Sequence, residues 1–239
     1  MTQWQRFLNG HPEYLARHYW WAYLWEKGVW FFDHQPVINA ILFGQYRNLL
    51  DCALALTKKD QSHGRVLQLA CVYGDLTPKL LKSIKQELYL ADVAQIQLQA
   101  TRQKLDTVKR ARLISARMNA EQLAYCDNAF ATTLIFFLLH EMPTAARERT
   151  LNEVIRTLKP GGRVIVVEYA PLPKHHVLWR FPPTRAVLMQ LEPFLSDFWQ
   201  EDMLTMLKRS GKRYDKQVYQ TELRHFFYRF YRISVFRVG

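Results

Sequence analysis

The fold is decided by Arg65-Val-Leu-Gln-Leu-Ala-Cys-Val-Tyr-Gly-Asp-Leu-Thr77, a stretch whose pattern predicts a buried strand, a tight turn and then a helix. In doubly wound α/β proteins this turn is where a nucleotide-like cofactor is held. Such turns usually carry several glycines, whereas this one has Cys71, Val72 and Tyr73 ahead of a single Gly74. The sequence therefore predicts a cofactor-binding fold in which the chemistry at the turn has changed.

From this stretch toward the C-terminus, strand patterns alternate with helix patterns. We expect buried strands at 66–70, 88–91, 111–116, 132–139 and 163–169, with helices at 77–85, 94–108 and 144–158. Beyond a proline-rich insert we expect a helix at 193–209 and strands at 213–220 and 227–238. This alternation predicts a mostly parallel seven-stranded sheet with an antiparallel last strand and helices on both faces. We assign residues 61–239 to one α/β domain and residues 1–60 to an N-terminal aromatic helical cap that is not an independent domain.

The chain is strongly basic, with a formal net charge of +12, and the basic excess is greatest over residues 203–239. Nucleic acid and an anionic membrane surface are the partners that such a charge attracts. Five of the seven tryptophans lie between Trp4 and Trp30, and this composition is typical of the boundary between lipid and water. We therefore favour a peripheral membrane protein over a nucleic-acid binder. A helical lid that buries these aromatics is an alternative, and the two interpretations are compatible.

Three other features of the sequence indicate the cellular compartment. A membrane-spanning helix needs about eighteen consecutive apolar residues, and the sequence has no such run. The first residues, MTQWQRFLNG, lack the apolar core of a signal peptide. The three cysteines, Cys52, Cys71 and Cys126, have no zinc-type spacing, so we expect reduced thiols. These features predict a cytoplasmic protein that associates peripherally with the inner (cytoplasmic) membrane.

Two acidic residues mark the expected cofactor site. Asp92 ends the second strand, where a carboxylate accepts hydrogen bonds from the ribose hydroxyls of a nucleoside, although it could instead cap the next helix. Asp75 either binds an amino group of the cofactor or caps the helix at Thr77. Tyr73 either contacts the bound molecules through its hydroxyl or only fills the volume left by the missing glycines.

Histidines and carboxylates gather where the fourth and fifth strands end. His140 and Glu141 could form a general base with its orienting acid or part of a metal site. The alternative is that Glu141 caps the next helix and His140 lines the cleft. Glu168 ends the fifth strand and His175 and His176 follow it, and these groups suit a divalent ion such as Mn²⁺, Mg²⁺ or Fe²⁺. We hypothesise that these groups and His140 face one pocket.

The motifs together resemble the class I S-adenosylmethionine (SAM)-dependent methyltransferase superfamily, which has a Rossmann-like fold, over residues 60–170. The nearest relatives look like the quinone C-methyltransferases of ubiquinone and menaquinone synthesis, and more specifically the rhodoquinone biosynthesis (RquA) proteins. The resemblance rests on four segments, which read VLQLACVYGDLT (66–77), FFLLHEMP (136–143), RTLKPGGR (156–163) and LEPFLSDFW (191–199). The chain departs from the methyltransferase pattern at Gln68, where an acid is usual, and at Cys71, Val72 and Tyr73. These departures suggest that methyl transfer is not the reaction.

The resemblance implies that SAM is a co-substrate that donates its amino group to ubiquinone, replacing a ring methoxy group to give rhodoquinone, with Mn²⁺ as the metal. The implied cofactor-binding residues are Ala70, Tyr73, Gly74, Asp75, Asp92, Asn119, Ala120 and Phe136. The catalytic candidates are Tyr73, His140 and Glu141. The metal candidates are His140, Glu168, His175 and His176. The alternatives are a methyltransferase that acts on a quinone or another lipophilic aromatic, and an inactive SAM-fold protein that binds quinone or assembles a biosynthetic complex.

Overall fold

The computed structural model describes residues 9–59 and 64–239, so Trp4 lies outside the described residues. Its centre is a seven-stranded sheet in the order β3-β2-β1-β4-β5-β7-β6. Five strands run parallel: β1 (Val66–Leu69), β2 (Leu88–Asp92), β3 (Leu113–Arg117), β4 (Phe130–Phe136) and β5 (Leu158–Tyr169). The last strand, β7 (Tyr231–Val238), is antiparallel to both β5 and β6 (Val218–Phe226). The expected α/β fold with an antiparallel last strand is confirmed.

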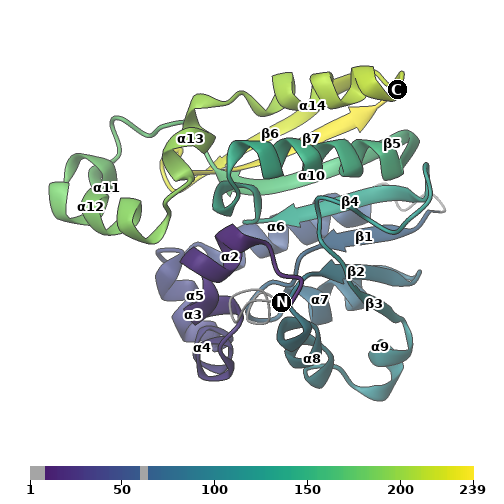
Figure 1. The fold of residues 1–239 in the computed structure, drawn as a ribbon, viewed down its shortest axis with the longest axis horizontal. Helices are drawn as coiled ribbons and strands as arrows, with labels where there is room; N and C mark the ends of the chain where they lie inside the picture. Colours follow the sequence, from purple (N-terminus) through teal and green to yellow (C-terminus); the bar gives the residue numbers. More distant parts are fainter. Residues whose placement is uncertain (1–8, 60–63) are drawn as a thin grey trace.

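Helices cover both faces of the sheet (Figure 1). In that view α10 (Thr144–Thr157) and α14 (Met203–Arg213) lie in front of the sheet, and α6 (Tyr46–Lys59) lies behind it. Residues of β1 and β4 are almost all buried, as a parallel sheet between two helical layers requires. On α6, the apolar side chains of Leu49, Leu50 and Ala53 have no exposed surface. Their spacing at three and four residues forms the stripe that packs onto the sheet.

The helix expected at 94–108 is two helices, α8 (Gln95–Gln103) and α9 (Thr107–Ala111). The cause is Asp106, whose carboxylate accepts a hydrogen bond from the Lys109 amide and so starts a new helix. The helix expected at 193–209 divides in the same way into α13 (Leu195–Gln200) and α14, because Asp202 caps the start of α14.

Strand boundaries also shift from their expected positions. β5 begins at Leu158 rather than at residue 163, and its pairing with β4 is irregular between Leu158 and Arg163. β4 ends at Phe136, and the three residues after Leu138 form the short 3₁₀ helix η1 (Leu139–Glu141). Because α14 continues to Arg213, β6 begins only at Val218.

In the described part of the chain, four short helices, which we call the cap helices, precede α6. They are α2 (Glu13–His18), α3 (Trp20–Tyr23), α4 (Glu26–Phe32) and α5 (Gln35–Ile41). Figure 1 shows them in purple at the carboxyl ends of the parallel strands, at the same end of the molecule as α11 (Val177–Arg180) and α12 (Pro182–Leu191). The remaining helix, α7 (Leu76–Ser83), follows the turn after β1. The cap helices and the helices α11 and α12 therefore both lie at the edge of the sheet where ligands bind in open α/β folds.

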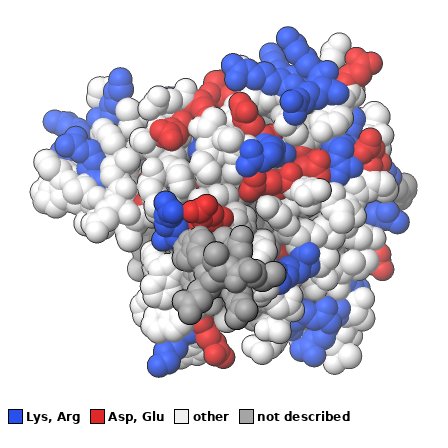
Figure 2. Space-filling view, in the orientation of Figure 1, with Lys and Arg blue, Asp and Glu red and all other residues white. Residues whose placement is uncertain are grey.

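Positive charge is unevenly distributed on the surface. Figure 2 shows lysine and arginine side chains gathered along its upper edge, where Figure 1 places α14. This helix carries Lys208, Arg209, Lys212 and Arg213. Four of the nine lysines and arginines of residues 203–239 thus lie on one helix, away from the cap helices.

Candidate functional site

The turn after β1 is held by the carboxylate of Asp92. The Cys71 amide donates a hydrogen bond to Asp92 Oδ2 at 2.6 Å, and the Ala94 amide donates one to Oδ1 at 2.7 Å. Burial raises the pKa of the Asp92 carboxyl group, although these two amide hydrogen bonds oppose the shift. Ala70 begins the turn with φ of 70°, a left-handed conformation that glycine adopts most easily. Asp92 therefore joins the ends of two adjacent strands in addition to facing a cavity.

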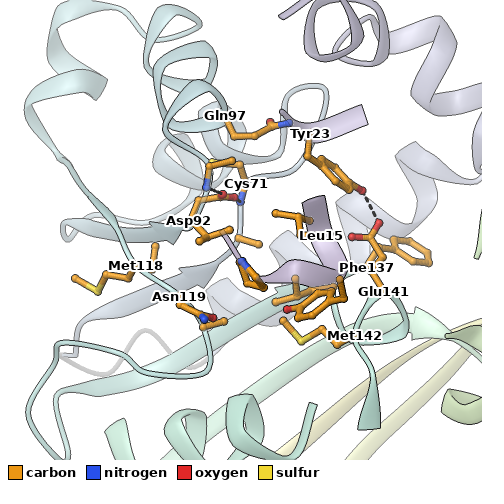
Figure 3. A pocket seen from close by; sticks show the side chains of 18 residues that line it. Leu15, Tyr23, Cys71, Asp92, Gln97, Met118, Asn119, Phe137, Glu141 and Met142 are labelled. Atoms are coloured by element: carbon orange, nitrogen blue, oxygen red, sulfur yellow. Dashed lines mark hydrogen bonds between the residues drawn. The ribbon is translucent and has the colours of Figure 1, made fainter. Parts of the chain in front are cut away.

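That cavity, the first cavity, lies beyond the ends of β1 and β2 (Figure 3). It contains four of the predicted cofactor-binding residues: Ala70, Asp92, Asn119 and Ala120. The cap helices close it with Tyr14, Leu15 and Tyr23. Its other lining residues include Cys71, Gln97, Met118, Phe137, Glu141 and Met142.

Tyr73 does not line the first cavity. Its hydroxyl donates a hydrogen bond to the carbonyl of Ala22 and accepts one from Gln97 Nε2 at 2.9 Å. Its ring stacks on Tyr23, with 5.7 Å between the ring centroids and 10° between the planes. Burial raises the pKa of the Tyr73 phenol. The residue thus ties the turn to the cap helices, and its hydroxyl is occupied by protein groups.

Gly74 and Asp75 lie behind the turn rather than in the first cavity. A Cβ atom on Gly74, whose φ is +80°, would lie 2.6 Å from the Tyr46 hydroxyl oxygen. That hydroxyl donates to the Tyr73 carbonyl and to Asp75 Oδ1, each at 3.1 Å. Asp75 also pairs with Lys79 and makes no side-chain capping hydrogen bond to its helix. The contacts of Asp75 are therefore structural, and the alternative that it caps the helix is wrong.

A second, largely apolar cavity lies beside the first. Cap helices supply Tyr19, Trp21, Ala22, Tyr23, Phe32, Ile38 and Ile41 to its wall, and the sheet and turn supply Val72, Tyr73, Phe136 and Tyr169. Phe136, predicted to bind the cofactor, lies here and not in the first cavity. The two cavities share Tyr23, Cys71, Phe137 and Glu141. A molecule in one cavity is therefore separated from a molecule in the other by only these side chains.

Polar groups converge at one point of the second cavity. His140 Nε2, Glu141 and Glu192 each place a ligand atom within 4.8 Å of the other two, and we call these residues the His–Glu cluster. His140 Nε2 lies 3.6 Å from Glu192 Oε2. On the other side of the ring, His140 Nδ1 lies 2.8 Å from Glu168 Oε2. Glu168 has no exposed surface and also accepts a hydrogen bond from the Leu139 amide at 2.7 Å. Glu168 thus orients the imidazole from behind.

The charges of this group are strongly coupled. Burial disfavours the protonated form of His140, but the carboxylates of Glu168 and Glu192 outweigh burial and raise its pKa well above the usual value. Burial would raise the pKa of Glu168, yet His140 and the Leu139 amide lower it overall. For Glu141, burial raises the pKa to about 8, and Glu192 adds to the effect while His140 opposes it. An imidazolium and a carboxylate therefore form a buried pair beside a carboxyl group that titrates near neutral pH.

The two histidines that follow β5 lie elsewhere. His175 is exposed, and His176 is buried against Phe227 and Phe230, where its Nδ1 accepts a hydrogen bond from the Leu178 amide. Both line a separate groove with His225. Within the described part of the chain, no group of three or more potential metal ligands includes either of them. The hypothesis that His175 and His176 face one pocket with His140 is therefore wrong.

Sequence reasoning missed three residues of this site. Glu192 lies within the segment 191–199 that carried part of the family resemblance, so a signal for it was present. Tyr19 donates to Glu192 at 3.1 Å, and the Tyr23 hydroxyl donates to Glu141, as the dashed line in Figure 3 shows. Both tyrosines belong to an aromatic segment in which nothing local distinguishes them.

The alternative that Glu141 caps the next helix is also excluded, because α10 begins after Pro143 without a side-chain cap.

Solved structures with the same fold include a cyclase and an N-methyltransferase. The [4+2]-cyclase SpnF superposes with a TM-score of 0.58 and 17% identity, covering 80% of this chain and 79% of that one. The N-methyltransferase NodS from Bradyrhizobium japonicum, solved with S-adenosyl-L-homocysteine, gives a TM-score of 0.54 and 14% identity, covering 80% of this chain and 86% of that one. At such identities the likeness shows the fold alone.

Sequence comparison is more specific. The chain is 37% identical over 125 residues to the ubiquinone/menaquinone biosynthesis C-methyltransferase UbiE of Photorhabdus laumondii, a match covering 49% of each chain. It is 32% identical over 146 residues to the enzyme of the same name from Pseudoalteromonas translucida, covering 59% of this chain and 57% of that one. The matches thus span only about half the length of these relatives. The model of the ubiE/COQ5 methyltransferase family matches residues 33–187, more than half of the chain. The chain therefore belongs to the ubiE/COQ5 methyltransferase family.

Proposed function

We propose that the chain is a quinone-modifying transferase that uses SAM as its co-substrate. The observation that carries this proposal is the pair of adjoining cavities, which share Tyr23, Cys71, Phe137 and Glu141. The first cavity offers Asp92 to ribose hydroxyls and Asn119 with Ala120 to an adenine base. The second offers an apolar wall with a few convergent polar groups, which is typical of a site for a lipophilic ring.

The more specific proposal is amino transfer from SAM to ubiquinone, as in the RquA proteins. In its first step the amino nitrogen bonds to the ring carbon that bears a methoxy group. The methoxy group then leaves as methanol, taking up the proton lost by the nitrogen. In the second step, elimination within the SAM chain breaks the bond between the nitrogen and the α-carbon: the β-carbon loses a proton, a double bond forms between these two carbons, and the nitrogen takes up the proton and stays on the ring as an amino group. Glu141 is the group we assign to pass the proton of the first step from the nitrogen to the methoxy oxygen, because it borders both cavities. Tyr73 is a positioning residue in this scheme, because its hydroxyl is engaged by Ala22 and Gln97.

The residues present fit the Mn²⁺ ion that the RquA resemblance implies. One imidazole nitrogen and two carboxylates, from the His–Glu cluster, suit a divalent ion of this type. Glu168 supplies the hydrogen bond to Nδ1 that metal-bound histidines almost always make. When bound, the cation would polarise a quinone carbonyl and make the ring more electrophilic. We therefore revise the proposed ligand set to His140, Glu141 and Glu192, with Glu168 behind it.

The proposed setting is the surface of an anionic membrane. None of the helices in the described part of the chain is long and apolar enough to span a bilayer. The rim of the second cavity carries Ile41 and Leu191, which are 46% and 48% exposed, and Trp30 and Phe31 of α4 are exposed nearby on the cap helices. Large exposed apolar side chains around a lipophilic site support the entry of an isoprenoid quinone directly from lipid.

Methyl transfer to a quinone is the second candidate. Family membership favours it, since the matched relatives are named as C-methyltransferases. The two candidates differ in the group that SAM donates, which is the methyl group in one and the amino group in the other. The altered turn at residues 71–73 favours donation of the amino group. Both candidates use the same two cavities.

One labelling experiment separates the candidates. Purified protein is incubated with Mn²⁺, with SAM that carries ¹⁵N in its amino group and deuterium in its methyl group, and with one of two quinones in anionic vesicles. One quinone is ubiquinone, and the other has an unsubstituted ring carbon, because the fully substituted ring of ubiquinone offers no carbon to methylate. A ¹⁵N-labelled aminoquinone in the lipid mass spectrum supports amino transfer, and a deuterated methylquinone supports methyl transfer. Neither label in the quinone would contradict both.

Two variants test, in the same assay, which cavity binds SAM and which binds the quinone. Asp92→Asn should lose product together with S-adenosylhomocysteine binding measured by calorimetry, because it weakens the ribose contact by roughly 1.5–3 kcal/mol. Glu192→Gln should lose product while S-adenosylhomocysteine still binds, because Glu192 lies only in the second cavity. Loss of S-adenosylhomocysteine binding in Glu192→Gln would contradict the assignment of the cavities.

A further inference from the structure

Two phenols from the cap helices reach the carboxylates of the His–Glu cluster. Tyr19 is 3% exposed, and its hydroxyl donates to Glu192 Oε2 at 3.1 Å. The Tyr23 hydroxyl donates to Glu141 Oε1. The two rings lie side by side, with 6.1 Å between their centroids. One short segment around α3 therefore contacts both acidic members of the cluster.

These carboxylates come from elements that are otherwise independent. Glu141 ends η1 after β4, whereas Glu192 ends α12 in the segment after β5. Hydrogen bonds to a ligating carboxylate fix its orientation. Tyr19 bonds Glu192 Oε2, the oxygen that also lies 3.6 Å from His140 Nε2, and each of the two carboxylates keeps a second oxygen that its phenol does not contact. The phenols are held in place in turn, because Tyr23 stacks on Tyr73 and the Tyr73 hydroxyl donates to Ala22 of the same helix.

We infer that Tyr19 and Tyr23 are positioning residues of the cation site, so that the site is complete only when the cap helices are docked over it. This inference rests on the proposed cation site. It also gives the cap helices a role beyond covering an apolar cavity, because docking and cation binding become linked. By reciprocity, the factor by which a docked cap strengthens cation binding equals the factor by which the cation favours docking.

The test measures cation binding directly. The full chain is freed of metal by chelation, and Mn²⁺ alone is titrated while the electron paramagnetic resonance signal of the free ion is followed. Loss of an outer-shell partner typically weakens metal binding by about 10- to 100-fold, so Tyr19→Phe and Tyr23→Phe should each raise the Kd by that factor. Tyr14→Phe is the matched control, because it removes a phenol of the cap helices that hydrogen-bonds a different carboxylate, Glu121. Its Kd should match that of the unmodified chain.

Proteolysis gives a second readout that does not depend on activity. Lys27 in α4 is exposed, so trypsin cleavage after it reports opening of the cap helices. Mn²⁺ should slow this cleavage in the unmodified chain and in Tyr14→Phe, but much less in Tyr19→Phe and Tyr23→Phe. Equal urea midpoints for the variants would establish that all are folded.

The possible failures are distinct. If the unmodified chain binds no Mn²⁺, the proposed cation site is wrong and the inference falls with it. If it binds Mn²⁺ and all three phenylalanine variants bind equally well, the cation site stands and the positioning role of Tyr19 and Tyr23 is refuted. The latter conclusion also follows if Mn²⁺ leaves the cleavage rate after Lys27 unchanged.

Discussion

Replacing Glu168 by glutamine tests the buried pair on which the site is built. The carboxylate has no exposed surface and lies 2.8 Å from His140 Nδ1, so the change removes one charge of a buried ion pair at constant volume. Removing one partner of such a pair costs roughly 3–5 kcal/mol. Glutamine retains an oxygen for the Leu139 amide, and His140 can lose its proton, so we expect the lower end, about 3 kcal/mol. With a urea m-value of about 3 kcal/mol/M, the unfolding midpoint should fall by about 1 M.

The effect of Glu168→Gln should also depend on pH. The raised pKa of His140 contributes stability that is fully present below its unfolded pKa of about 6.5 and is lost as pH rises through the folded pKa. The lowered pKa of Glu168 contributes stability present above about 4.3 and lost as pH falls through its folded pKa. The difference in unfolding free energy between the unmodified chain and Glu168→Gln should therefore be largest between about pH 5 and 6.5, and it should shrink at high pH.

The assay is urea unfolding of metal-free protein, followed by tryptophan fluorescence at several pH values. Glu222→Gln is the control, because this glutamate pairs with Lys59 and Arg224 at the surface, where an ion pair contributes about 0–1 kcal/mol. Equal unfolding midpoints for Glu168→Gln and the unmodified chain at pH 6 would refute the reasoning. They would mean that the pair does not determine how His140 is held.

Two further predictions concern the turn after β1. Gly74→Ala should cost about 1–2 kcal/mol for the left-handed conformation and about 1 kcal/mol more for displacing the hydrogen bonds of Tyr46. Gly161→Ala is the control, because Gly161 has φ of +75° but no atom lies near its added Cβ, so only the cost of the left-handed conformation applies. Equal urea midpoints for the two variants would contradict the predicted clash between the Cβ at residue 74 and Tyr46. Burial and the nearby Asp92 raise the pKa of the Cys71 thiol, so iodoacetamide at pH 8 should alkylate it far more slowly than the exposed Cys126. Peptide mass spectrometry over time checks this order, and equal rates would show that the turn is open.

Local sequence pattern was enough to predict the sheet and part of the first cavity. The strand from Val66 to Leu69 and the acid at Asp92 follow from rules that act within one β-α-β unit. Asn119 and Ala120, which line the first cavity, came only from the family resemblance, because an Asn-Ala pair by itself indicates no more than a loop. Helix breaks were harder to place, because Asp106 and Asp202 cap new helices inside what the hydrophobic pattern presents as continuous ones. Propensity decides such breaks only weakly.

The His–Glu cluster could be predicted only in part, because its members meet through the tertiary fold. His140 and Glu168 were recognisable since parallel strands bring their carboxyl ends to one edge. Glu192 and Tyr23 come from segments on either side of the α/β core, and no rule based on spacing connects them. His175 and His176 had the right chemistry and the right strand, but the chain turns away after Ala170 and places them in another groove.

The missing glycines at the turn have a structural explanation that connects the two cavities. Ala70 accepts the left-handed conformation where glycine is usual, at a cost of about 1–2 kcal/mol, and the Cys71 amide is fixed by Asp92. Of the side chains that follow, Cys71 lies beside Asp92 and lines both cavities, whereas Val72 and Tyr73 line only the second. In a glycine-rich turn this volume would be open to the cofactor. Here it forms the wall against which a lipophilic ring would rest, so the substitutions that weaken the methyltransferase motif are the ones that build the second cavity.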